Sequence, residues 1–111
     1  MTRDEINKIL NAAARVIIQK GSINILFEKE NVKIKLPTTR ELAKEIGTPH
    51  YYVLPGFSRM EEEKFVTREE RVGIWTTNGG TKILLSILET EFSEETKKIL
   101  GANIFNLLTE K

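Results

Sequence analysis

The sequence has no cysteine, a single histidine and only three prolines in 111 residues. Without cysteine the chain can form neither disulfide bonds nor thiolate ligands, which fits a reducing cytoplasm. A zinc site or a Cys–His catalytic pair would need side chains that are missing here. No apolar stretch approaches the roughly 20 residues that a membrane span requires. We therefore expect a cytoplasmic protein that binds neither a membrane nor a metal ion.

Motifs typical of enzymes are missing as well. The chain has no glycine-rich phosphate-binding loop and no Gly-x-Ser-x-Gly nucleophile elbow. Its acidic clusters, 61–63 and 69–70, are runs of adjacent residues. Side chains of adjacent helical residues diverge by about 100°, so they do not converge on one cation. We predict that the protein is not an enzyme and has no cofactor.

The net charge of +1 gives little indication of a partner. Residues 1–37 carry seven basic and four acidic side chains, residues 38–82 carry seven of each, and residues 83–111 carry three and five. A protein that binds DNA usually has a clearer basic excess. The length and the 40% hydrophobic content indicate one compact domain. A function must therefore be argued from the residue pattern.

The N-terminal third predicts a helix followed by a β-hairpin. Apolar residues recur with helical spacing from Ile6 to Ile18, and Gly21 ends the pattern. Two short runs follow at 23–28 and 32–36. The second alternates apolar residues with lysine, which is the period of a half-buried strand.

Two short helices joined by a tight turn are predicted next. Thr38 or Thr39 caps a helix over residues 40–46, and Gly47 closes it. Thr48 and Pro49 then start another helix that runs to about residue 63. A pair of this kind is the helix-turn-helix device, whose second helix enters the major groove of DNA.

Pro55 falls inside this second helix, where a proline lacks the N–H that the helix needs. Two structures are possible. Either one helix begins at Thr48 and kinks near Pro55, or a single turn breaks and a new helix begins at Pro55. We favour the kinked helix, because Thr48-Pro49 is itself a good helix start.

The rest of the chain predicts a second hairpin and two more helices. Strands are expected at 65–68 and 72–77, after which Asn78-Gly79-Gly80 breaks the chain. Helices are expected at 81–92 and, capped by Ser93, at 94–109. The prediction is an α+β, mainly α fold: a winged helix-turn-helix with an N-terminal helix, a β-hairpin wing and two C-terminal helices. Residues 1–80 form the DNA-binding domain, and residues 81–111 form a helical dimerisation tail packed on the same core.

One stretch of about 40 residues, Leu36 to Thr76, resembles the GntR family of bacterial and archaeal regulators. LPTTRELA at 36–43 is similar to the family's LPSxRELA, and EEEKFV at 61–66 is similar to its LEEEGLV. Gly47 falls at the turn glycine, and Gly73-Ile74-Trp75 resembles the wing's G-T-F. The short tail resembles the YtrA-type members. The resemblance implies a sequence-specific transcription regulator that binds double-stranded DNA as a homodimer through its tail helices.

Eight residues are candidate DNA contacts. The resemblance implies a phosphate contact at the start of the first short helix, and polar or aromatic side chains follow on the recognition helix and beside the wing tip. The candidates are Arg40, His50, Tyr51, Tyr52, Ser58, Arg59, Arg68 and Arg71. Trp75 is expected to be core rather than contact.

Departures from the family pattern leave a second function open. Leu54, Pro55 and Gly56 occupy exposed recognition-helix positions that are usually polar in the family, and Glu69 and Glu70 place negative charge at the wing tip. The alternative is a winged-helix module for protein–protein interaction that does not bind DNA. The sequence indicates neither an operator nor an effector ligand.

The tail carries more apolar residues than one small core needs, which favours a two-fold partner. These residues are Ile83, Leu84, Ile87, Leu88, Ile99, Leu100, Ile104, Phe105, Leu107 and Leu108.

Overall fold

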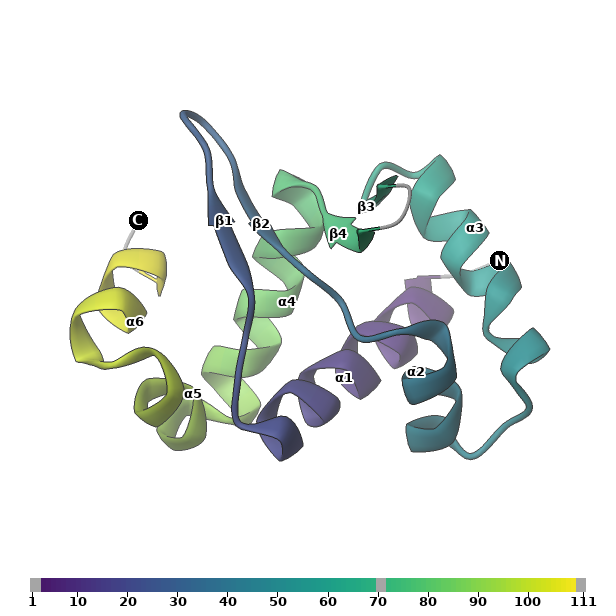
Figure 1. Cartoon of the computed structure of the whole chain (residues 1–111), viewed down its shortest axis with the longest axis horizontal. Coiled ribbons are helices and arrows are strands. Elements are labelled where there is room, and N and C mark those ends of the chain that lie inside the picture. The colour runs from purple at the N-terminus through teal and green to yellow at the C-terminus, as the bar shows by residue number, and fades with distance from the viewer. Residues whose placement is uncertain (1–2, 70–71, 110–111) are drawn as a thin grey trace.

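The computed structural model describes residues 3–69 and 72–109, which form an α+β, mainly helical fold (Figure 1), as the sequence predicted. Its elements are α1 (Arg3–Lys20), β1 (Ile25–Phe27), β2 (Val32–Ile34), α2 (Thr39–Ile46), the 3₁₀ helix η1 (His50–Tyr52), α3 (Leu54–Glu62), β3 (Val66–Glu69), β4 (Gly73–Thr76), α4 (Asn78–Glu91), α5 (Ser93–Leu100) and α6 (Ala102–Thr109). No helix within these described ranges has the length and hydropathy needed to cross a bilayer.

Helix α1 is the centre of the hydrophobic core. It packs against α2, α3 and α4, and Figure 1 shows it running between α4 on one side and α2 and α3 on the other. Ile6, Leu10 and Ile17 are buried along it, as the helical spacing predicted. At Gly56 of α3 an added Cβ would lie 2.2 Å from the Ile9 side chain, so the glycine allows α3 to approach α1 closely.

Two antiparallel hairpins form where the strand-like runs of the sequence predicted them. Ile25 pairs with Ile34 in the β1–β2 hairpin, and Val66 pairs with Thr76 in the β3–β4 hairpin. The hairpins meet just beyond β2, where a bridge joins Lys35 to Trp75 and Leu36 N donates to Ile74 O at 2.8 Å. This junction fixes the second hairpin against the segment that leads into α2.

Buried threonine hydroxyls connect β2, β4 and α4. Ile34 N donates to Thr76 Oγ1 at 2.8 Å, and Thr81 Oγ1 donates to Val32 O at 2.5 Å. Thr81 has thereby used its only proton, so the 2.5 Å contact between the two hydroxyls is a bond from Thr76 to Thr81. This series of hydrogen bonds runs from Ile34 N through the two threonine hydroxyls to Val32 O. Each donor and acceptor in it therefore has a partner, as buried polar groups require.

The predicted caps of α2 are present. The Thr38 hydroxyl accepts from Glu41 N while Glu41 Oε1 accepts from Thr38 N, a complete capping box. Gly47 ends the helix with φ of 87°, a left-handed conformation that favours glycine.

The prediction of one kinked recognition helix was wrong, and the chain instead has the alternative structure with a break before Pro55. Residues 50–52 form a separate 3₁₀ turn, and α3 begins at Leu54 with Pro55 in its first turn. Proline is favoured there because the N–H it lacks has no partner inside the helix. The break therefore relieves the conflict that a continuous helix would have had at Pro55.

The tail also departs from the prediction. Asn78-Gly79-Gly80 does not break the chain but forms the first turn of α4, which Thr77 caps through a bond from Gly80 N. The expected helix over 94–109 is divided at Gly101, whose φ of 84° ends α5 before α6 begins. Ser93 is the first residue of α5 rather than its cap. The described part of the tail thus has three helices instead of two.

Candidate nucleic-acid interface

The acidic side chains of α2 are engaged by α1. Glu45 accepts from Arg15 Nε at 2.8 Å and from Gln19 Nε2 at 3.0 Å. Glu41 pairs with Lys20. The Arg15 guanidinium lowers the pKa of Glu45, with Gln19 adding to the effect; Lys20, and next the Thr38 N–H, lower the pKa of Glu41. Both negative charges of α2 are therefore neutralised locally on the side that faces α1.

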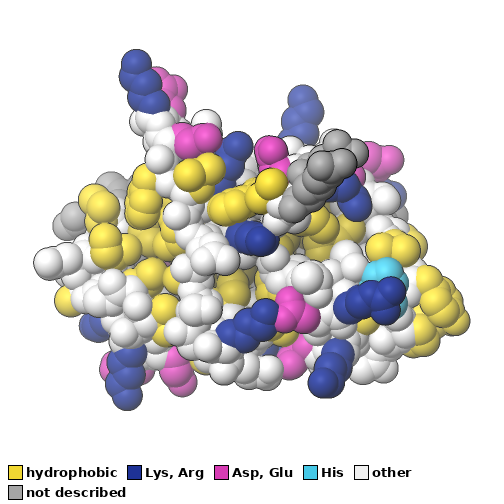
Figure 2. Space-filling view, in the orientation of Figure 1, with side chains coloured by type: hydrophobic (Ala, Val, Ile, Leu, Met, Phe, Trp, Pro, Cys, Tyr) yellow, Lys and Arg dark blue, Asp and Glu magenta, His cyan; other side chains and the backbone are white. Residues whose placement is uncertain are grey.

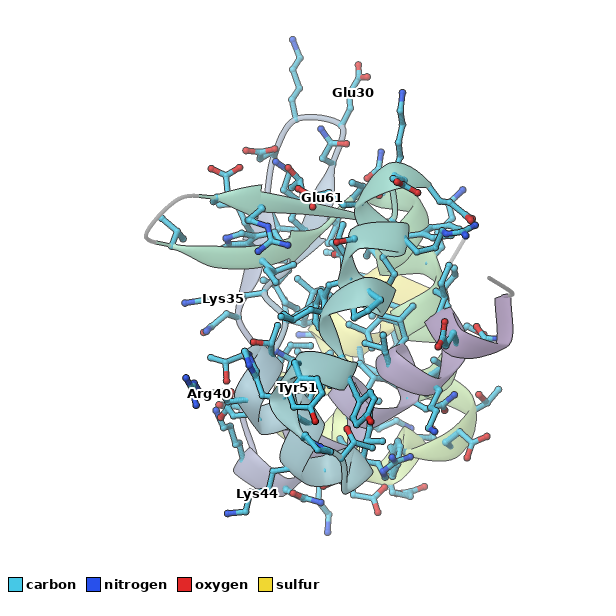
Figure 3. The ribbon with its side chains drawn as sticks, turned by 90° about the vertical axis from the view of Figure 1, so that its right-hand side faces the viewer. Glu30, Lys35, Arg40, Lys44, Tyr51 and Glu61 are labelled. Carbon is cyan, nitrogen blue, oxygen red and sulfur yellow. The ribbon has the colours of Figure 1, made fainter. Side chains whose placement is uncertain are left out.

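The basic side chains of α2 point elsewhere. Arg40 and Lys44 are exposed, and with Lys35 they lie along one edge of the molecule in Figure 3. We call these three residues the basic edge. None of them forms an ion pair with another side chain within residues 3–69 and 72–109. The equal charge count of residues 38–82 thus conceals a surface that is locally positive.

Beside the basic edge, η1 presents two aromatic rings. Tyr51 and Tyr52 are each 64% exposed, and their ring centroids lie 4.7 Å apart at an angle of 36°. We call them the tyrosine pair. Figure 3 shows Tyr51 on the face that Arg40 and Lys44 border, and Figure 2 shows dark blue side chains next to the cyan histidine on that side. His50 fastens the turn to α2, because its Nε2 lies 2.6 Å from Thr39 Oγ1.

The predicted DNA contacts that follow η1 in the sequence differ in exposure and in ion pairing. Ser58 is exposed on α3. Arg59 pairs with Glu63 at 3.5 Å and Glu62 at 3.8 Å, so its charge is already compensated. Arg68 of β3 pairs with Glu61 at 3.5 Å. The acidic cluster 61–63 thus provides partners for two arginines that the sequence predicted as DNA contacts.

Two wing predictions remain to be placed. Arg71 lies outside the described residues. Trp75 is half-buried rather than core, and it lines a small hollow between the two hairpins with Leu26 and Val72.

Lys35 and Lys44 are members of the basic edge that sequence reasoning did not select. Lys44 lies four residues after Arg40, so the helical period places both on one face of α2. That signal was available. The sequence around Lys35 did not indicate that it would lie near α2. Its position depends on the bridge to Trp75, which joins the two hairpins.

A second surface is a groove of about 780 Å³ between the β1–β2 hairpin, α4 and α6. Phe27, Leu85 and Leu107 are among the residues that line it. Of the apolar tail residues, Leu84, Leu88, Phe105 and Leu108 are buried within the chain. Leu107 is 63% exposed and Ile104 is 36% exposed. The apolar excess of the tail is therefore smaller than the sequence suggested, and its exposed part is concentrated on α6.

Over the described residues, no three His, Asp or Glu side chains come together in a way that could hold a metal ion. Comparison of the chain with protein-family models, curated proteins and solved structures finds no match. A function must therefore be inferred from the residues of this chain.

Proposed function

We propose that the protein is a cytoplasmic transcription regulator that binds double-stranded DNA as a dimer, through a winged helix-turn-helix. The observation that carries this proposal is the separation of charge on α2. Its acids are paired with α1, while Arg40 and Lys44 are exposed near aromatic rings and have no ion-pair partner among the described residues. Cations that hold no internal partner are available to DNA phosphates.

The arrangement of elements supports this assignment. Helices α2 and α3 are joined through Gly47 and η1, and the β3–β4 hairpin follows α3 directly. In this interpretation η1 and α3 together form the recognition element, and the hairpin forms the wing. The bridge between Lys35 and Trp75 holds the wing beside the basic edge.

The proposal is tested by measuring the affinity for duplex DNA over a series of salt concentrations. The basic edge supplies three cations per protomer, so a dimer would neutralise about six phosphates. The logarithm of the binding constant should then fall against the logarithm of salt concentration with a slope of about −5. An affinity that does not change with salt would contradict binding through phosphates.

The dimer is expected to form through α6 and the groove beside it. Exposed Leu107 and Ile104 lie on a helix that has no charged side chain between Ala102 and Leu108. Light scattering at about 10 μM should report a dimer, and Leu107→Glu should shift it to monomer by placing a charge in an apolar contact. Leu26→Glu, an exposed leucine on β1, is the matched control and should remain dimeric. A monomeric parent protein would refute this expectation.

A second candidate function is a protein-interaction module without DNA binding. Tyr51, Tyr52 and Leu54 form an exposed aromatic and apolar patch, and tyrosine is enriched at protein interfaces. The pairing of Arg59 and Arg68 with glutamates also engages two of the predicted DNA contacts. Under this function the protein would show no salt-dependent binding to any duplex.

A further inference from the structure

We infer that the tyrosine pair, together with Leu54, reads the 5-methyl groups of thymine in the major groove. The inference rests on the proposed DNA binding and adds the chemistry by which the site chooses its sequence. It predicts operators with thymines at the contacted positions.

Several residue types are missing from the first part of the recognition element. Residues 48–58, which include η1 and the first turn of α3, contain no Arg, Lys, Asn, Gln, Asp or Glu. Arg and Lys read guanine, Asn and Gln read adenine, and acidic side chains read cytosine. His50 is engaged with Thr39 through Nε2. The side chains that usually recognise guanine, adenine and cytosine by hydrogen bonds are therefore missing from residues 48–58.

The same segment exposes aromatic and apolar side chains instead. Tyr51 and Tyr52 are each 64% exposed and Leu54 is 39% exposed. The centroid separation of 4.7 Å makes the two rings one nearly continuous apolar surface. Thymine offers the single apolar group on the major-groove edges of the four bases, its 5-methyl group. An apolar surface that faces the major groove therefore has one matching partner.

This surface is held in place. Val53, directly after the tyrosine pair, is only 4% exposed and anchors the turn in the core. The bond between His50 and Thr39 fixes the other end of η1 to α2. Arg40 and Lys44 on α2 border the face that carries Tyr51 and would hold the DNA backbone on that side.

The experiment replaces thymine by uracil, which removes the methyl group and leaves the hydrogen-bonding edges unchanged. The full chain is used to select duplexes from a random-sequence pool, and the affinity for the selected duplex is measured with thymine and with uracil. Each contacted methyl group removed should weaken binding about fourfold, the value of burying one such group. As a control, uracil is placed in the part of the duplex that the protein does not contact, where it should have no effect on the affinity.

Substitutions of Tyr51 and Tyr52 test whether their rings contact the thymine methyl groups. Tyr51→Phe with Tyr52→Phe keeps the rings, and this variant should still distinguish thymine from uracil. Tyr51→Ala with Tyr52→Ala should lose most of the difference in affinity between the two duplexes while its salt dependence persists. Equal affinity of the parent protein for both duplexes would overturn the inference and leave the proposed function standing, and this comparison needs no variant to fold. A parent protein that binds no duplex would overturn the proposed function itself.

Discussion

Gly80→Ala is expected to destabilise the fold by about 3 kcal/mol or more, whereas Gly79→Ala should leave it unchanged or stabilise it. A Cβ at position 80 would lie 2.0 Å from the backbone oxygen of Phe65, and Gly80 is buried. The obstacle is a main-chain carbonyl rather than the tip of a flexible side chain. The start of α4 or the chain near Phe65 would have to move to make room.

Gly79 is the matched control, one residue earlier in the same helical turn. A Cβ at that position would lie 3.5 Å from Phe65 Cδ1, an ordinary contact. Alanine is also the better helix former, by up to about 1 kcal/mol. Thermal unfolding should place the melting temperature of Gly80→Ala about 12 °C or more below that of Gly79→Ala. Equal melting temperatures would show that α4 does not approach Phe65 as closely as described.

The role of these glycines shows why the tail was predicted less well than the rest. The dipeptide Gly79-Gly80 has the composition of a loop, so local propensity predicted a break in the chain. Glycine is needed at position 80 because α4 passes close to the backbone at Phe65, a contact between residues 15 apart in sequence. A requirement of that kind arises from tertiary packing and leaves no local pattern.

Elements that depend on local chemistry were predicted correctly. A cap at Thr38 or Thr39 and a stop at Gly47 depend on a few adjacent residues, and the structure has the cap at Thr38 and the stop at Gly47. The alternation of apolar residues and lysine gave the first hairpin. The helix around Pro55 was harder, because its two possible structures differ only in where the helix begins. The proline lies in the first turn of α3, where its ring conflicts with no preceding helical turn.

The sequence identified basic residues that could contact DNA, but it did not predict which of them form ion pairs within the protein. Each of Arg40, Arg59 and Arg68 carries a charge that could contact a phosphate. The structure distinguishes them, because Arg59 and Arg68 have glutamate partners and Arg40 has none in the part of the chain that the structure describes. Pairing between Glu61 and Arg68 depends on how α3 packs beside β3, which a charge count along the chain cannot reveal.

Reversing the charge of Arg40 and Lys44 together, as Arg40→Glu with Lys44→Glu, is expected to weaken binding to duplex DNA on the order of 100-fold near physiological salt. Two contacts with phosphate would be lost on each protomer, and each would be replaced by repulsion. Neither side chain has an ion-pair partner within residues 3–69 and 72–109, so the substitutions break no internal salt bridge. Thermal unfolding of the variant should accordingly stay close to that of the parent protein.

The matched control makes the same change in net charge at a distance from the basic edge. Lys29 on the tip of the β1–β2 hairpin and Lys98 on α5 are exposed, and Figure 1 shows both elements away from α2. Lys29→Glu with Lys98→Glu should lower the affinity several-fold at most, through long-range electrostatics that salt screens. If both double variants lost affinity equally, net charge rather than the basic edge would govern binding. If neither did, phosphate contact through Arg40 and Lys44 of α2 would be wrong.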